Sequence, residues 1–233
     1  MCLTSKQGKF FYEQGKLDRQ QGKLDTRGVS FHIPSLPVVD FDTFGEYNVT
    51  WKSEFREEHM KKATREHLAK VAKEMALVPF HGAVDGLESN LAPVVRPFPT
   101  WNIREADGLW CAAFVLYCCR EAGFEIPYRP NECKTCHLAA CFGWEEFAIN
   151  DHRIEYHKGT EAFVPKAGDI VIYDRVFENR EHDHMGIVLE KREHALLAAE
   201  GNVNNISGII ERPIDEHIRA YIRIPDGYQY RAK

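Results

Sequence analysis

The chain has 233 residues, of which 44% are hydrophobic, 12% aromatic and 28% charged. This length and composition suffice for one well-buried core with an extension, and they differ from those of a mostly disordered or fibrous protein. The 30 basic and 35 acidic residues leave a net charge of −5, which argues against a nucleic-acid-binding domain. We also expect no membrane span, because no run of about 18 or more apolar residues occurs.

Residues 1–50 are predicted to form an irregular leader. Gln-Gly-Lys occurs three times between residues 7 and 23, and a glycine in every repeat opposes a stable helix. The polar N-terminus lacks the apolar segment of a secretory signal, which predicts a chain that starts in the cytoplasm. A larger precursor or a phage-type route of release is the alternative. In the cytoplasm the seven cysteines are expected to be reduced, which leaves catalysis, metal binding or burial as their roles.

Apolar residues recur at helical spacing from Ser53 to Leu77, and Pro79 follows. This pattern predicts one amphipathic helix, whose first part within residues 51–64 links the leader to the domain that follows. Acidic and basic side chains interleave on its other face, which favours a solvated surface. Three prolines between Pro93 and Pro99 predict an extended connection.

A second helix is predicted over residues 110–122, where most side chains are apolar. Runs of β-branched residues between turn signals then predict several consecutive strands. These strands are expected at Asp169–Tyr173, Met185–Leu189, Ala195–Ala199, Gly208–Glu211 and Ile218–Ile224. One helix followed by sequential strands is typical of an α+β fold rather than of an alternating α/β fold.

Cys111 is the first candidate for a catalytic residue. It follows Trp110 and the turn-like residues 106–109, so we expect it in the first turn of the helix at 110–122. The partial positive charge of a helix N-terminus stabilises a nucleophilic thiolate, and the free N–H groups there can hold an oxyanion. A buried structural thiol is the alternative, and position alone does not decide between the two.

His184, Glu200 and Asn202 are the next candidates. His184 opens a predicted strand and would pair with Cys111 if it faced the helix N-terminus. Glu200 and Asn202 lie two residues apart on a strand, so both would point to the same face and either would orient the imidazole. An exposed loop histidine and a Gly-Asn turn are the alternatives for these segments.

A separate cluster of thiols and one imidazole lies between Cys111 and His184. It consists of Cys133, Cys136, His137 and Cys141. These donors suit zinc, and Cys-x-x-Cys-His is also the haem attachment pattern. Because Cys136 and His137 are adjacent and no second ligand pair follows, we favour loop or core thiols over a zinc site.

Four motifs occur in order along the chain: Trp110–Val115, Pro165–Val171, His184–Glu190 and Glu200–Asn202. Together they resemble the CHAP family, the cysteine- and histidine-dependent amidohydrolases and peptidases, and Ile218–Ile222 looks like that family's final strand. The resemblance covers residues 65–226 and leaves residues 227–233 as a C-terminal tail. It implies a papain-like α+β core related to NlpC-type peptidases, in which a nucleophile helix packs on an antiparallel sheet of five or six strands. An N-terminal helical or irregular extension would precede this core.

The resemblance also implies an activity on peptidoglycan peptides, as a muramoyl-alanine amidase or a cross-link endopeptidase. Cys111 would be the nucleophile, His184 the general base and acid, and Glu200 the residue that orients His184, with Asn202 as its neighbour or substitute. No metal or organic cofactor is needed. An amidase with the same core acting on an amide outside the wall, a catalytically silent binding module and a metal-binding protein are the alternatives.

Overall fold

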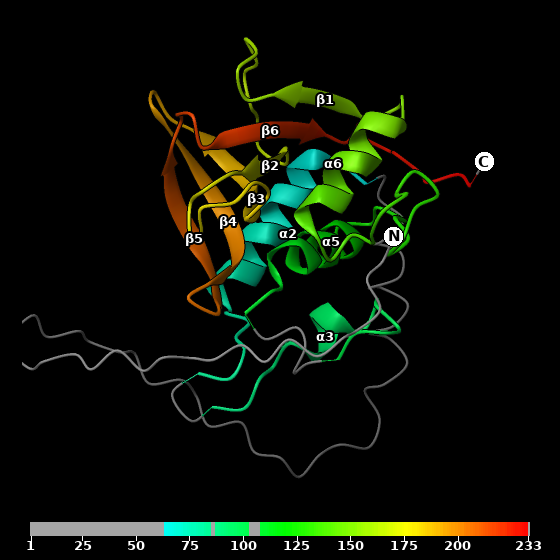
Figure 1. Cartoon of the computed structure of the whole chain (residues 1–233), viewed down its shortest axis with the longest axis vertical. Coiled ribbons are helices and arrows are strands. Elements are labelled where there is room, and N and C mark those ends of the chain that lie inside the picture. Colours follow the sequence, from blue (N-terminus) through cyan, green and yellow to red (C-terminus); the bar gives the residue numbers. More distant parts are fainter. Residues whose placement is uncertain (1–62, 85–86, 103–107, 233) are drawn as a thin grey trace, which may run out of the picture. The chain divides into compact units, whose positions relative to one another are not determined.

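The computed structural model describes residues 63–84, 87–102 and 108–232. The predicted leader at 1–50 and the first part of the predicted helix, up to residue 62, lie outside this range. The helices are α2 (Arg65–Leu77), α3 (Ala92–Val95), α5 (Cys111–Glu121) and α6 (Cys141–Asn150). The strands are β1 (Glu155–Lys158), β2 (Ile170–Tyr173), β3 (His184–Lys191), β4 (Ala195–Val203), β5 (Ile206–Pro213) and β6 (Ile218–Arg223) (Figure 1).

The six strands form one sheet in the order β1-β6-β2-β3-β4-β5. Every neighbouring pair in this sheet is antiparallel. The described helices all precede the six strands in the chain instead of alternating with them. The α+β class predicted from the sequence is therefore confirmed.

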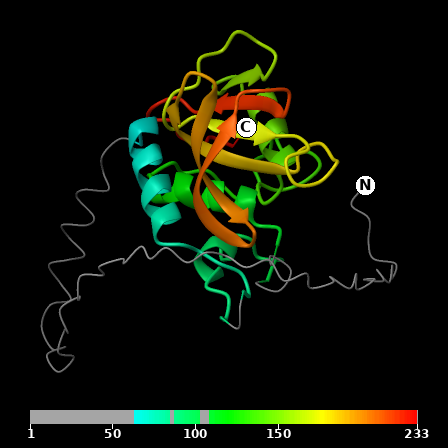
Figure 2. The ribbon, with the colours of Figure 1, turned by 90° about the vertical axis from the view of Figure 1, so that its left-hand side faces the viewer.

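Helices α2 and α5 pack against the same face of the sheet, over β3 and β4. Figure 2, turned from the first view, shows the twisted sheet beside these helices. All four residues of β2 are buried, and they alternate between two apolar clusters. Ile170 and Ile172 join the main core under the helices, whereas Val171 and Tyr173 join a smaller cluster. Since successive residues of a strand point to opposite faces, the smaller cluster covers the other face of the sheet.

Two sequence predictions before residue 100 are wrong. A single helix from Ser53 to Leu77 is excluded, because Thr64 is extended (φ −128°, ψ 153°) and its hydroxyl oxygen accepts a hydrogen bond from the N–H of His67. Thr64 therefore caps a helix that begins at Arg65. The proline-rich segment is also not wholly extended, because residues 92–95 form the short helix α3. Pro93 lies at the start of α3, where a missing N–H costs nothing.

The predicted helix at 110–122 and the five predicted strands are present, as α5 and β2 to β6, and β3, β4 and β5 are longer than predicted. The sequence reading missed α6 and β1. The apolar residues Trp144, Phe147 and Ala148 follow Cys141 at helical spacing, which is typical of a helix. The prediction treated this segment only as part of a possible metal-binding cysteine cluster. Strand β1 is short and half-exposed, so it carries little apolar pattern.

Two further features complete the fold. After β6, the buried Tyr228 packs in the main core and donates a hydrogen bond to Asp151 at 2.7 Å, so the predicted C-terminal tail contacts the domain. Within the part of the chain that the structure describes, no helix is long and apolar enough to cross a membrane.

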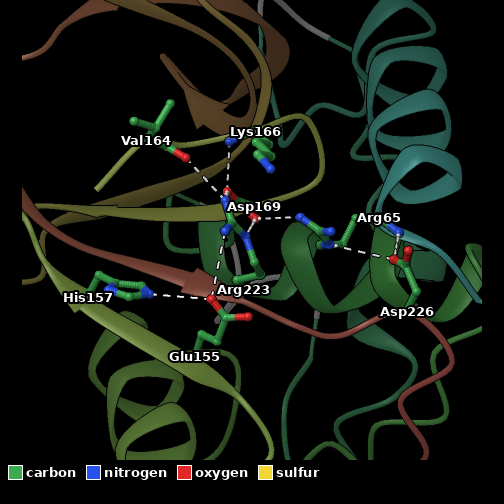
Figure 3. Close-up of polar contacts among 8 residues, drawn as sticks. All are labelled: Arg65, Glu155, His157, Val164, Lys166, Asp169, Arg223 and Asp226. Atoms are coloured by element: carbon green, nitrogen blue, oxygen red, sulfur yellow. Dashed lines mark hydrogen bonds and ion pairs between the residues drawn. The ribbon is translucent and has the colours of Figure 1, made fainter. Parts of the chain in front are cut away.

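A buried carboxylate joins three parts of the fold. Asp169, just before β2, is fully buried and accepts hydrogen bonds from Nε and Nη2 of Arg223 at 2.9 and 2.7 Å. It also accepts from the N–H of Lys166 at 2.8 Å, and Nη1 of Arg65 lies 3.5 Å away (Figure 3). Asp169 thus connects the start of α2, the turn before β2 and strand β6.

Replacing Asp169 with Asn should lower the free energy of unfolding by about 3 kcal/mol, because the substitution leaves Arg223 partly buried without its main counter-charge. Urea denaturation measures this change. The matched control is Glu211→Gln, which breaks the exposed pair between Glu211 and Arg192 and should cost less than about 1 kcal/mol. Equal losses for the two variants would contradict the structural role given to Asp169.

Candidate active site

Cys111 is the first residue of α5 and so lies in the first turn of the helix, where the sequence predicted it. The turn between β4 and β5 holds this end of the helix, because Oδ1 of Asn205 accepts a hydrogen bond from the indole Nε1 of Trp110 at 2.9 Å. Strand β4 approaches the helix closely at Gly201, where a Cβ atom would lie 2.5 Å from Cβ of Phe114. Only glycine permits this approach, which sets the thiol against the end of the sheet.

His184 and Glu200 meet between neighbouring strands. His184 begins β3, and its Nε2 lies 2.8 Å from Oε2 of Glu200 on β4. Gly186 pairs with Glu200 across the two strands, and a Cβ at Gly186 would lie 2.7 Å from Cγ of Glu200. The glycine therefore makes room for the carboxylate beside the imidazole. With Nε2 engaged by Glu200, Nδ1 is the ring nitrogen that can exchange a proton with Cys111.

Arg212 of β5 contacts the carboxylate of Glu200. Its Nε and Nη2 donate to the two carboxylate oxygens of Glu200 at 3.0 and 2.7 Å, as a bidentate pair. Because Glu200 is fully buried, a lone carboxylate there would be costly, and the guanidinium offsets that cost. The sequence reading missed Arg212, since nothing in the spacing of residues 200 and 212 identifies them as partners before the register of β4 and β5 is known.

Two aromatic rings enclose His184. The ring of Tyr173 stacks on the imidazole with centroids 6.2 Å apart, and the ring of Phe177 meets it edge-on at 4.8 Å. Asp183 holds the loop that carries Phe177, because its Oδ2 accepts from the N–H groups of Phe177 and Glu178. The imidazole is only 1% exposed, so its charge state depends on its protein neighbours.

The surroundings favour a thiolate at Cys111 and a protonated ring at His184. The hydrogen bond with Cys141 lowers the pKa of Cys111 most; burial opposes this, and His184 and the N–H of Ala112 lower the pKa further, to well below its usual value. Burial alone would lower the pKa of His184, but the interactions with Cys111 and Glu200 outweigh it and raise that pKa to about 9. A thiolate–imidazolium pair results, which is the reactive form of a cysteine nucleophile.

Cys141, at the start of α6, brings a second thiol to this site. Its Sγ lies 3.7 Å from Sγ of Cys111. The pKa of Cys141 is raised well above its usual value, first by its hydrogen bond to Cys111 and then by burial. Cys141 is therefore the thiol that donates, and Cys111 is the sulfur that accepts.

A cavity of about 590 Å³ opens beside both sulfurs. Apolar and aromatic side chains line one part of it, including Trp101, Leu109 and Phe142, and polar groups of the loop at 180–183 line another. This size is typical of pockets that take a small ligand or a short peptide. A substrate in the cavity would contact Cys111 directly.

Of the two candidates for orienting His184, the structure brings Glu200 to the ring. The expected alternation fails at Asn202, because the register shifts between Glu200 and Val203 and Asn202 has a φ of 64°. Its amide instead donates to the carbonyl oxygen of Gly108 at 2.9 Å, and its Oδ1 has no hydrogen-bond partner among the described residues. Asn202 lines the cavity and fixes the turn that leads to Cys111.

Three of the four candidate zinc ligands have separate contacts. Cys133 donates to the carbonyl oxygen of Gly143 at 3.3 Å, Cys141 contacts Cys111, and Nδ1 of His137 accepts from the N–H of Ala139. In residues 63–84, 87–102 and 108–232, no group of three or more such side chains is placed to hold a metal ion. The structure does not assemble Cys133, Cys136, His137 and Cys141 into a site.

Comparison with models of known protein families and with curated proteins gives no match for this chain.

The site predicts how the thiols react. At neutral pH, iodoacetamide should alkylate Cys111 before the fully buried Cys118 and Cys119, whose pKa values burial raises. His184→Ala should slow the reaction at Cys111 about 10-fold at pH 6 to 7, because loss of the imidazolium reduces the thiolate fraction. Peptide mapping by mass spectrometry after timed quenching measures each rate. Faster labelling of Cys118 than of Cys111 would contradict the assigned charge state.

Proposed function

We propose that this chain is a cysteine-dependent amide hydrolase with a papain-like CHAP core, acting on the peptide part of peptidoglycan. The observation that carries the proposal is the buried line from Cys111 through His184 to Glu200. A thiolate at a helix N-terminus, a charged imidazole and an orienting carboxylate are the three groups that acyl transfer to cysteine requires.

In the proposed mechanism, Cys111 Sγ attacks the amide carbonyl carbon. The N–H groups in the first turn of α5, which have no partner within the helix, would hold the developing oxyanion. His184 then gives its proton to the leaving amine, and an acyl-enzyme remains on Cys111. A water molecule, deprotonated by His184, releases the acyl group and restores the thiolate.

The remaining groups support the imidazolium through this cycle. Glu200 stabilises the positive charge of His184 and forms a hydrogen bond with its Nε2. Nδ1 is then the ring nitrogen that gives and takes the proton during the reaction. Arg212 keeps Glu200 ionised, since the pKa of the buried Glu200, which burial alone would raise, is lowered by its bonds with His184 and Arg212. No step needs a metal ion or an organic cofactor.

Peptidoglycan is proposed as the substrate because of the four ordered motifs, and the cavity is compatible with it. Its apolar part, near Trp101 and Phe142, suits peptide side chains, and its charged part, near Arg180 and Asp183, suits the charged groups of a wall peptide. Both a muramoyl-alanine amide and a peptide cross-link present the carbonyl that this mechanism needs.

Digestion of purified peptidoglycan tests the proposal. Wild-type protein should release new muropeptide fragments, which mass spectrometry identifies together with the bond that is cut. Cys111→Ala should release none, and His184→Ala almost none, because the two groups act as a unit. Glu200→Gln should reduce the rate by about 10²- to 10⁴-fold, because the amide keeps a hydrogen bond to His184 but loses the charge that stabilises the imidazolium.

Cys136→Ala is the matched control, since Cys136 is a partly exposed thiol outside this line and its loss should leave the rate unchanged. Identical fragments from wild type and Cys111→Ala would overturn the proposed mechanism. If wild type releases no fragments but Cys111 is acylated by other amides, the substrate lies outside the wall. If no amide reacts at Cys111, the result favours a catalytically silent binding module over a hydrolase.

A further inference from the structure

The proposed hydrolysis needs one thiol, but the structure places two beside the cavity. Cys111 begins α5 and Cys141 begins α6, and their sulfurs are 3.7 Å apart. Both residues line the cavity, so a small molecule that enters it reaches both. The acyl-transfer steps form and break bonds at Cys111 alone, and Cys141 contributes to them only through the hydrogen bond that lowers the pKa of Cys111.

Three buried thiols, Cys118, Cys119 and Cys133, lack this arrangement. Cys118 and Cys119 lie further along α5 and are fully buried in the main core. Cys133 donates to the carbonyl oxygen of Gly143, and burial raises its pKa to about 12, which leaves it an unreactive thiol. The Cys111–Cys141 pair therefore combines a reactive sulfur with a neighbouring one at an accessible place.

A contact between the two helices keeps the two cysteines close together. The indole Nε1 of Trp144 in α6 donates to the carbonyl oxygen of Ala112 in α5 at 3.3 Å and to that of Leu138 at 3.0 Å. This shared contact ties the starts of α5 and α6 together, beside Cys111 and one turn from Cys141. The sulfurs are thus neighbours because of a buried contact between the helices.

The geometry permits a covalent bond between these sulfurs. An S–S bond is about 2.05 Å long, so the sulfurs would approach each other by about 1.7 Å. Each cysteine is the first residue of its helix, so no preceding helical turn blocks rotation of its side chain. The proposed bond therefore requires rotation about the two χ1 angles, which leaves the backbone of both helices in place.

The charge states also suit an ordered oxidation. Cys111 carries the thiolate, which is the form that attacks a peroxide. Cys141 keeps its proton and donates it toward Cys111. The first sulfur to be oxidised is therefore Cys111, and the sulfur that can then attack it is already in contact.

We propose that Cys111 and Cys141 form a reversible disulfide when hydrogen peroxide enters the cavity, with Cys141 as the resolving thiol. The Cys111 thiolate attacks one peroxide oxygen, the O–O bond breaks, and sulfenic acid at Cys111 and hydroxide form. Cys141 Sγ then attacks the sulfenyl sulfur, an S–S bond forms, and its proton leaves with the hydroxyl group as water. The two thiols lose two electrons and one peroxide is reduced. A dithiol such as dithiothreitol restores both thiols and is itself oxidised.

This disulfide would block the proposed hydrolysis, because it occupies the attacking sulfur, and it would protect that sulfur from irreversible oxidation. The effect on hydrolysis rests on the proposed function, but the formation of the disulfide does not. The test therefore follows the sulfur chemistry directly and needs no substrate.

The full chain, reduced and freed of reductant, is treated with a small molar excess of hydrogen peroxide and digested with chymotrypsin without reduction. Cleavage after Phe114, Leu138 and Phe142 separates Cys111 from Cys118 and separates Cys141 from Cys136. Wild type should yield a peptide pair linked through Cys111 and Cys141, which dithiothreitol releases. In Cys141→Ala, Cys111 should instead gain two or three oxygens that dithiothreitol does not remove.

Cys141→Ser repeats the test with a side chain closer in size, and circular dichroism checks that both variants fold. Cys136→Ala is the control and should give the same linked pair as wild type. Sulfinic acid at Cys111 in wild type without a linked pair would overturn the proposal, as would a disulfide from Cys111 to any other cysteine. A linked pair in a protein that hydrolyses no amide would leave the disulfide proposal intact and reject the proposed function alone.

Discussion

The buried line of alternating charges at Cys111, His184, Glu200 and Arg212 is the constraint on which the rest of the structure depends. His184 and Glu200 are almost fully buried, at 1% and 0% exposed, where an isolated charge would be prohibitive. Each charged group is stabilised by a neighbouring group of opposite charge. The four groups come from four different elements: α5, β3, β4 and β5. The order of the strands in the sheet is therefore also the order of the charges.

The apolar core and the polar site share the same helix. Helix α5 is buried along nearly its whole length, and it approaches β4 closely because Gly201 carries no side chain. This packing leaves only the N-terminal end of α5 open to the cavity, where its dipole and free N–H groups favour an anion. The groups gathered at that end, Cys141, His184 and the N–H of Ala112, favour the thiolate of Cys111, while Cys118 and Cys119 on the same helix lie in the core.

The sequence predicted α5 and β2 to β6, and it pointed to Cys111, His184 and Glu200 as candidates, because each follows from a local pattern or an ordered motif. Partners that depend on tertiary contacts were not predictable. Arg212 was missed because its pairing with Glu200 depends on the register of β5 against β4. Cys141 was assigned to a cysteine cluster because its contact with Cys111 arises only when α6 packs on α5. Asn202 was misplaced because a positive φ breaks the alternation on which the prediction depended.

A titration of His184 by nuclear magnetic resonance tests the central claim, the buried thiolate–imidazolium pair, most directly. The ring signal, assigned by comparison with His184→Gln, should titrate with a pKa of about 9 in the wild-type protein. In Cys111→Ala the pKa should fall, because burial continues to disfavour the charged ring while one of the two groups that stabilise it is gone. A wild-type His184 that titrates at or below its usual value, or one that does not change when Cys111 is removed, would contradict the account.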